Sequence, residues 1–185
     1  MRKIILTLTL LGLSVLCSAA PPDGPRHLVR AGWGDMMFEA LAYHSGAGRE
    51  HFGYTGHIFA DYRYRVTKVV SVGGQTDFQG IFWNEGEFRS RNYDICLIPN
   101  VRFTYFDNEY VKLYSGIGLG ALIAFDNAGK VEGAPAIDLT AFGVQAGKGH
   151  WGGFLDIGGL TALTGLNNIY MVSSRILSAG VYFCW

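Results

Sequence analysis

The sequence predicts an all-β protein, an eight-stranded antiparallel barrel with up-and-down topology. Three observations lead to this fold. Apolar and polar residues alternate with a period of two along most of the chain, which is the pattern of strands with two different faces. Turn residues divide the chain into eight such segments, an even number. Short and long connections alternate, so a closed sheet would carry all the tight turns at one end.

The expected strands differ in length but all are bounded by turn or loop residues. They are residues 26–34, 54–66, 68–79, 92–106, 110–125, 136–147, 151–162 and 173–185. Tight turns are expected at Thr67, 107–109 and 148–150, and long loops at 35–53, 80–91, 126–135 and 163–172. In the first long loop, DMMFEALAY is expected to form one or two helical turns capped by Asp35.

The segment YTGHIFADYRYRV shows the two faces most clearly. Ile58, Ala60 and Tyr62 share one face, whereas Asp61 and Arg63 share the other. The same contrast recurs in the next three segments. In the sixth segment the alternation holds only as far as Ala141, because after it apolar residues fall on the polar side. A β-bulge at this point would reset the register.

Alternation alone does not say which face is inside, because a soluble calycin-like barrel buries its apolar face and a membrane barrel exposes it to lipid. Charged residues are only 16% of the chain, against about 25% in soluble domains. The polar face holds no lysine except Lys112. Both features favour a transmembrane β-barrel, with a soluble secreted barrel as the alternative. Aromatic rings near strand ends suit an interfacial girdle: Tyr54, Tyr62, Tyr64, Tyr105, Phe125 and Trp185.

The N-terminal segment MRKIILTLTLLGLSVLCSAAPP has the layout of a secretory signal peptide. We expect residues 1–20 to be cleaved and residues 21–185 to form a single barrel domain. Lipidation at Cys17 is the alternative, although Leu16 is bulky where the lipoprotein peptidase prefers a small residue. No apolar run in the mature chain reaches about 18 residues, which excludes a membrane-spanning helix.

The last strand, ending SAGVYFCW, alternates to its final residue. With the glycine-rich segments LYSGIGLGALIAF and GGFLDIGGLTAL, it resembles the small eight-stranded outer-membrane barrels of the OmpX and OmpA-domain type. The resemblance implies export to the outer membrane of a Gram-negative envelope. It also implies a C-terminal signal for the barrel-insertion machinery, formed by Leu177, Ala179, Val181, Phe183 and Trp185. The family more often ends on Phe, with Tyr two residues earlier.

Charged residues of the polar face are expected to fill the lumen. Their signs balance: Arg30, Arg63, Arg65, Arg102 and Lys112 against Asp61, Asp77, Asp94, Asp138 and Asp156. An eight-stranded barrel has room only for side chains, and charges buried there must be paired. We therefore expect a lumen plugged by ion pairs and hydrogen bonds. Gly116, Gly118 and Gly120 are expected to make room for arginine and tyrosine side chains opposite them.

No catalytic, cofactor or metal site is expected from the sequence. Cys96 and Cys184 lie too far apart along the barrel for a disulfide and should be free thiols. The cysteines and histidines lack metal-ligand spacing. Without Arg2 and Lys3 the basic residues fall from 15 to 13 against 15 acidic ones, a net charge of −2. The mature chain also has no basic stripe, so nucleic acid is excluded as a partner.

These features predict a non-enzymatic membrane protein, an anchor that presents surface loops for binding or adhesion. Expected partners are outer-membrane lipid, lipopolysaccharide and an extracellular ligand that the sequence does not identify. One alternative is a lipid-modifying hydrolase or acyltransferase, for which His44 and Ser45 are adjacent candidates. A narrow channel is another. The best candidates for loop contacts are Phe38, Tyr43, His44, Phe52, Phe82, Trp83, Phe88 and Arg89.

Overall fold

The computed structural model describes residues 24–34, 52–85, 88–163 and 176–185, with backbone only at positions 52, 54, 83–85 and 88–90. The signal peptide expected at residues 1–20 and the helical turns expected in DMMFEALAY lie outside the described residues. The described part of the chain contains no helix long and apolar enough to cross a membrane.

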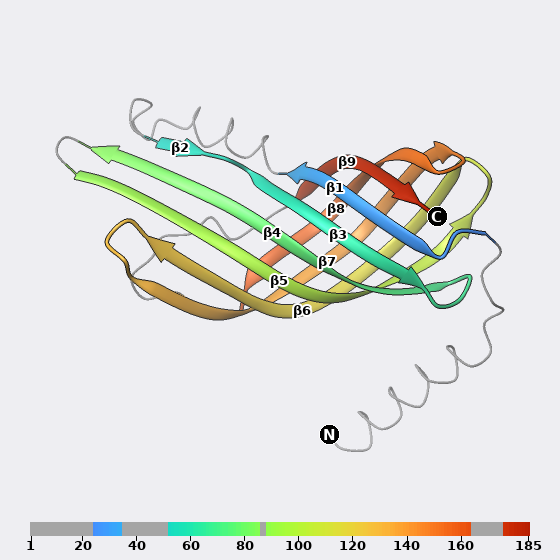
Figure 1. Ribbon diagram of the computed structural model, residues 1–185, viewed down its shortest axis with the longest axis horizontal. Coiled ribbons are helices and arrows are strands. Elements are labelled where there is room, and N and C mark those ends of the chain that lie inside the picture. The colour runs from blue at the N-terminus through green and yellow to red at the C-terminus, as the bar shows by residue number, and fades with distance from the viewer. Residues whose placement is uncertain (1–23, 35–51, 86–87, 164–175) are drawn as a thin grey trace, which may run out of the picture.

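The described residues form strands that wrap into a closed barrel (Figure 1). In chain order these are β1 (His27–Gly34), β2 (Phe52–Tyr54), β3 (His57–Arg65), β4 (Val70–Glu85), β5 (Phe88–Asp107), β6 (Val111–Asp126), β7 (Val131–Lys148), β8 (Trp151–Ala162) and β9 (Leu177–Cys184). β2 and β3 both pair with β4 and are separated only by Thr55 and Gly56. They therefore occupy one position, and the barrel has eight.

Every neighbouring pair of strands is antiparallel, and the sheet closes on itself. Two pairings complete the ring: β4 with β5, and β1 with β9 in a register from Leu28↔Cys184 to Gly34↔Ser178. Trp185 extends the second pairing, because its N–H donates to the carbonyl of His27 at 3.0 Å. The eight-stranded antiparallel barrel predicted from the sequence is confirmed.

The three tight turns lie where they were predicted, but two predicted long loops are wrong. Residues 80–91 are mostly strand, since β4 and β5 stay paired as far as Glu85↔Phe88. Residues 131–135 belong to β7, and a short turn replaces the loop: the Asp126 carboxylate accepts the N–H groups of Ala128 and Lys130 at 2.9 Å each. Glycines and charges suggested loops, but a hairpin ladder continues through them wherever the opposite strand supplies partners.

A bulge is present in β7 at the point where the alternation in the sequence breaks off after Ala141. The register with β8 shifts between Thr140 and Phe142. Before the shift Asp138 and Thr140 are buried, and after it Gln145 is buried while Phe142 is exposed. The extra residue thus keeps Gln145 inside and Phe142 outside, although their parity relative to Asp138 would predict the reverse.

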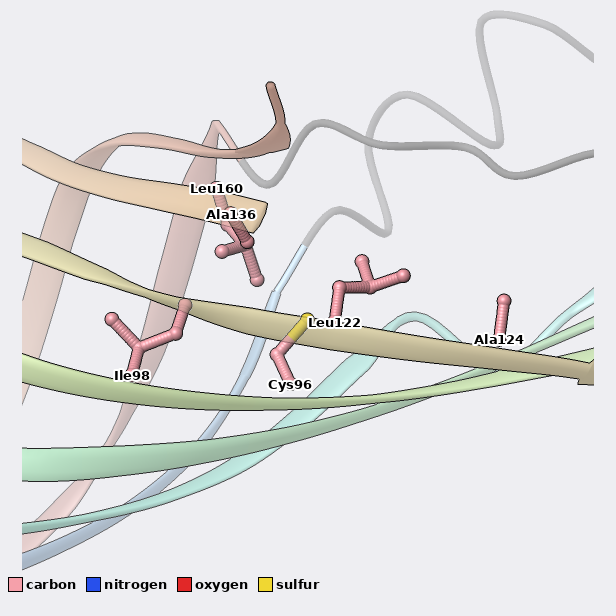
Figure 2. Close-up of a cluster of buried hydrophobic side chains, with 6 residues drawn as sticks. All are labelled: Cys96, Ile98, Leu122, Ala124, Ala136 and Leu160. Atoms are coloured by element: carbon pink, nitrogen blue, oxygen red, sulfur yellow. The ribbon is translucent and has the colours of Figure 1, made fainter. Parts of the chain in front are cut away.

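The barrel is apolar outside and polar inside. Leu97 and Leu119 are 66% and 59% exposed, although both are central in their strands. Other exposed apolar residues are spread over every strand of the barrel: Val29, Ile58, Val72, Ile95, Ile117, Ile123, Leu139, Leu155, Ile157 and Val181. One part of the interior is apolar too, where β5 to β8 contribute Cys96, Ile98, Leu122, Ala124, Ala136 and Leu160 (Figure 2).

Aromatic side chains gather near the two ends of the barrel. At the tight-turn end Phe183 contacts Trp151 and Trp185, with ring centroids 4.6 and 5.5 Å apart, and His27 stacks on Trp185 at 5.4 Å. Toward the other end Tyr93 stacks between Phe78 and Phe125, and Phe82 meets it edge-on. Such paired clusters are typical of the aromatic girdles of membrane barrels.

The two thiols should differ in accessibility, because Cys96 is fully buried whereas Cys184 is only partly buried and lies near the tight-turn end. A water-soluble maleimide should label Cys184 and spare Cys96 in the folded protein, and label both after unfolding. Mass spectrometry of the variants C96A and C184A assigns the sites. Rapid labelling of Cys96 in the folded barrel would contradict its inward position.

Candidate functional site

Arg30 lies at the centre of a buried cluster of charges inside the barrel. Its Nε donates to Asp61 Oδ2 at 2.6 Å, and its Nη1 donates to Asp156 Oδ2 at 2.8 Å and to the Tyr114 hydroxyl at 2.9 Å. The guanidinium carbon lies 4.4 Å from the centroid of the Phe154 ring. Because β1 and β3 pair Arg30 directly with Asp61, the register of the sheet itself creates the first of these contacts.

Asp61 is shared by three arginines. Its Oδ2 accepts from Arg63 Nε at 2.7 Å as well as from Arg30, and Arg102 Nη2 lies 3.7 Å away. All four side chains are at most 4% exposed. The low local dielectric strengthens these ion pairs and makes loss of any one partner costly.

Two neutral residues complete the cluster, and the sequence did not single them out. The Tyr114 hydroxyl donates to Asp156, and its ring lies 3.7 Å from the guanidinium of Arg102. Gln145 Oε1 accepts from Arg102 Nη1 at 3.3 Å. Parity places Tyr114 on the inward face, whereas Gln145 faces inward only because of the bulge between Thr140 and Phe142.

The expectation about glycines is wrong. The position of a Cβ at Gly118 is filled by Ile98 and Asn100, and that at Gly120 by the Leu97 and Ile98 backbone. Gly116 has no arginine or tyrosine side chain among its nearest contacts. The glycine that accommodates Tyr114 is Gly143 on the neighbouring strand, where a Cβ would lie 2.1 Å from the tyrosine ring.

Arg65 and Lys112 lie apart from this cluster, at the tight-turn end. Both pair with Asp107: the guanidinium of Arg65 with Oδ2, and Lys112 Nζ with Oδ1 at 3.3 Å. The sequence prediction had placed Asp107 in a turn and counted neither contact. These side chains are more exposed than the cluster around Arg30.

Asp77 and Asp94 occupy a different part of the interior, so the ten predicted residues do not form one network of five ion pairs. Asp94 lies eight positions from Arg102 on β5, about 26 Å along the strand. It interacts with Asp77 and hydrogen-bonds to Gln79, and His57 Nδ1 lies 3.7 Å from Asp77. Asp138 is also buried. The sequence gives residues their face correctly but not their partners.

A cavity of about 270 Å³ opens at the tight-turn end of the barrel. Its deeper wall is formed by Arg63, Arg102 and Gln145, and its rim by residues of the turns and of both chain ends, including Arg26, Lys112 and Tyr182. The Arg30 cluster lies behind this wall. At this end the lumen is therefore hollow, but only as far as Arg63 and Arg102.

The remaining predicted positions fall into three groups. Phe38, Tyr43 and His44 lie outside the described residues. Phe52, Trp83, Phe88 and Arg89 lie in strands, with only their backbones described, and Phe82 contacts Tyr93 at the end of a strand rather than in a loop. The C-terminal residues Leu177, Ala179, Val181, Phe183 and Trp185 alternate with the buried Ser178 and Tyr182. Among the residues that the structure describes, no group of His, Cys, Asp or Glu is placed to hold a metal ion.

An eight-stranded barrel with exposed aliphatic side chains and buried ion pairs has the architecture of a membrane β-barrel. Solved structures with similar folds include the N-terminal β-barrel domain of OprF from Pseudomonas aeruginosa, at 10% identity and a TM-score of 0.46, covering 88% of this chain and 100% of that one. OprG, an outer membrane protein of the same organism, shares 9% identity at a TM-score of 0.42, over 89% and 95%.

A third similar structure is that of Ail, the attachment invasion locus protein of Yersinia pestis, in complex with the heparin analogue sucrose octasulfate. It shares 15% identity at a TM-score of 0.43, over 85% of this chain and 97% of that one. These neighbours are eight-stranded outer-membrane barrels, the class that the sequence resembles. No protein-family model and no curated protein sequence matches this chain.

Replacing Arg30 with methionine should destabilise the barrel strongly, because Asp156 would lose its arginine partner while remaining buried. We expect the free energy of unfolding to fall by about 3–5 kcal/mol. Urea unfolding in lipid vesicles, followed by tryptophan fluorescence, measures the change. Lys148→Met is the control: it removes the exposed pair with Glu109 and should cost about 1 kcal/mol or less. Equal effects of the two substitutions would contradict a central role for Arg30.

Proposed function

We propose that this protein is an integral outer-membrane protein without enzymatic activity, in which the barrel anchors the chain and the connections at one end are presented for binding or adhesion. The observation that carries the proposal is the inversion of the two faces. Leu119 is 59% exposed at the middle of β6, whereas Arg30 is 1% exposed inside the barrel. In water this arrangement would leave the aliphatic residues solvated, whereas in a bilayer they contact lipid tails instead of water.

The proposed partners follow from the same surface. Lipid tails would contact the aliphatic band, and lipid headgroups, including lipopolysaccharide, would contact the aromatic clusters at its two edges. The barrel-insertion machinery would recognise β9 through its outward residues. The interior supports an anchor rather than a pore, because the Arg30 cluster and the apolar side chains of Figure 2 fill successive parts of the lumen.

No specific observation favours the alternatives. The adjacent His44 and Ser45 of the hydrolase hypothesis lie outside the described residues. A channel would have to pass both the buried arginines and the apolar cluster. The anchor function therefore remains the proposal that the described geometry supports best.

An arginine introduced on the outside should disturb membrane insertion according to its depth. Leu119→Arg, at the centre of β6, should destabilise the barrel folded in vesicles by about 2–4 kcal/mol, because the charge would lie in hydrocarbon. Val131→Arg, at an exposed position that is the first residue of β7, should cost about 1 kcal/mol or less. Heat-modifiable gel migration measures the folded fraction. If neither variant impairs folding into vesicles while both fold in water, the barrel is a soluble protein.

Purified protein in a planar bilayer should give no stable open level, because the Arg30 cluster and the apolar side chains of Figure 2 obstruct the described part of the lumen. The variant Arg102→Ala tests the arginine wall and should still be closed by the apolar cluster. Recurrent discrete openings of the unsubstituted protein would contradict the plugged lumen and favour the channel alternative.

A further inference from the structure

We propose that the cavity at the tight-turn end is a binding site for a small oxyanion, a phosphate or the phosphate group of a small phosphomonoester. The proposed site lies inside the barrel. It depends on the fold, and it is independent of any ligand bound by the connections at the other end. It rests on three independent features of the cavity: its unused hydrogen-bond donors, its charge and its size.

Three of the residues that line the cavity have a buried donor atom without a hydrogen-bond partner among the described residues. They are Arg63 Nη1, Arg102 Nη2 and Gln145 Nε2. Each of these side chains is at most 5% exposed. Arg102 Nη2 lies 3.7 Å from Asp61, beyond hydrogen-bond distance. Leaving such donors unsatisfied is costly, and the oxygens of an oxyanion are acceptors that could satisfy them.

Neighbouring side chains hold these donors in place by contacting other atoms of the same side chains. The Tyr114 ring lies 3.7 Å from the Arg102 guanidinium, and Gln145 Oε1 accepts from Arg102 Nη1. Arg63 is fixed through its Nε on Asp61. The site is thus preorganised, and an anion would bind without first ordering these side chains.

The charge of the cavity also favours an anion. The lining includes five basic side chains, Arg26, Arg63, Arg65, Arg102 and Lys112, against two acidic ones, Asp107 and Glu109. Behind the wall, Asp61 and Asp156 face three guanidiniums, those of Arg30, Arg63 and Arg102. These contacts join three guanidiniums to two carboxylates, and guanidinium groups suit phosphate oxygens.

The size of the cavity limits the ligand. A volume of about 270 Å³ lies just below the range of about 300–1,000 Å³ usual for small-molecule sites. It accommodates a tetrahedral oxyanion with a short substituent, and it is too small for a polysaccharide or a folded protein segment. The open mouth leaves room for a substituent to point out of the barrel.

Phosphate binding is measured by isothermal titration calorimetry on the full barrel in a zwitterionic detergent at constant ionic strength. Inorganic phosphate and glycerol 3-phosphate are titrated separately to distinguish the free ion from a phosphomonoester. Gln145→Glu removes the donor and adds a negative charge but keeps the acceptor for Arg102, so the barrel should fold and affinity should fall at least tenfold. Arg102→Gln should weaken binding by a similar factor.

Lys148→Gln is the matched control, because it removes a basic charge at the same end of the barrel from a residue that does not line the cavity. It should change affinity less than twofold. Binding of either ligand with this pattern of variants supports the site. The proposal is overturned if neither ligand binds at millimolar concentration, or if Lys148→Gln weakens binding as much as Gln145→Glu does. Folding of Gln145→Glu, checked by gel migration, keeps the result interpretable.

Discussion

The interior of this barrel depends on one carboxylate, that of Asp61. Three guanidiniums converge on it or lie beside it, and they would repel one another without it. Their other N–H groups need acceptors as well. The hydroxyl of Tyr114 on β6 accepts from Arg30, and the amide oxygen of Gln145 on β7 accepts from Arg102. The position of Gly143 follows in turn, because only a residue without a side chain leaves space for the tyrosine ring.

Sequence alone predicted the fold because its evidence is local. A period of two assigns Leu97 and Arg102 to opposite faces without knowledge of any partner, and composition then decides which face is outside. The bulge at Ala141 was predictable for the same reason, since the parity of Phe142 contradicts that of Asp138 unless a residue is inserted. Strand ends were less accurate: residues 80–91 look like a loop by propensity and become strand by pairing.

The pairing of charges could not be predicted, because it depends on contacts between strands distant in sequence. Equal numbers of acids and bases suggested five pairs, yet Asp107, a residue expected in a turn, takes both Arg65 and Lys112. Asp156 pairs with Arg30, although the two residues are 126 positions apart in the sequence. Those contacts follow from strand register and tilt in the closed barrel, which alternation does not encode. The cavity behind the turns was invisible for the same reason.

The partnership of β1 with β9 has a consequence for biosynthesis. Besides β3, which follows it closely in the sequence, β1 pairs with β9, so the ring cannot close until β9 has been synthesised. Until then the chain has two unpaired edges, each able to associate with another copy. A chain truncated before β9 would keep both edges permanently, however well its other hairpins formed. Holding the nascent chain apart from its neighbours is thus a requirement set by topology.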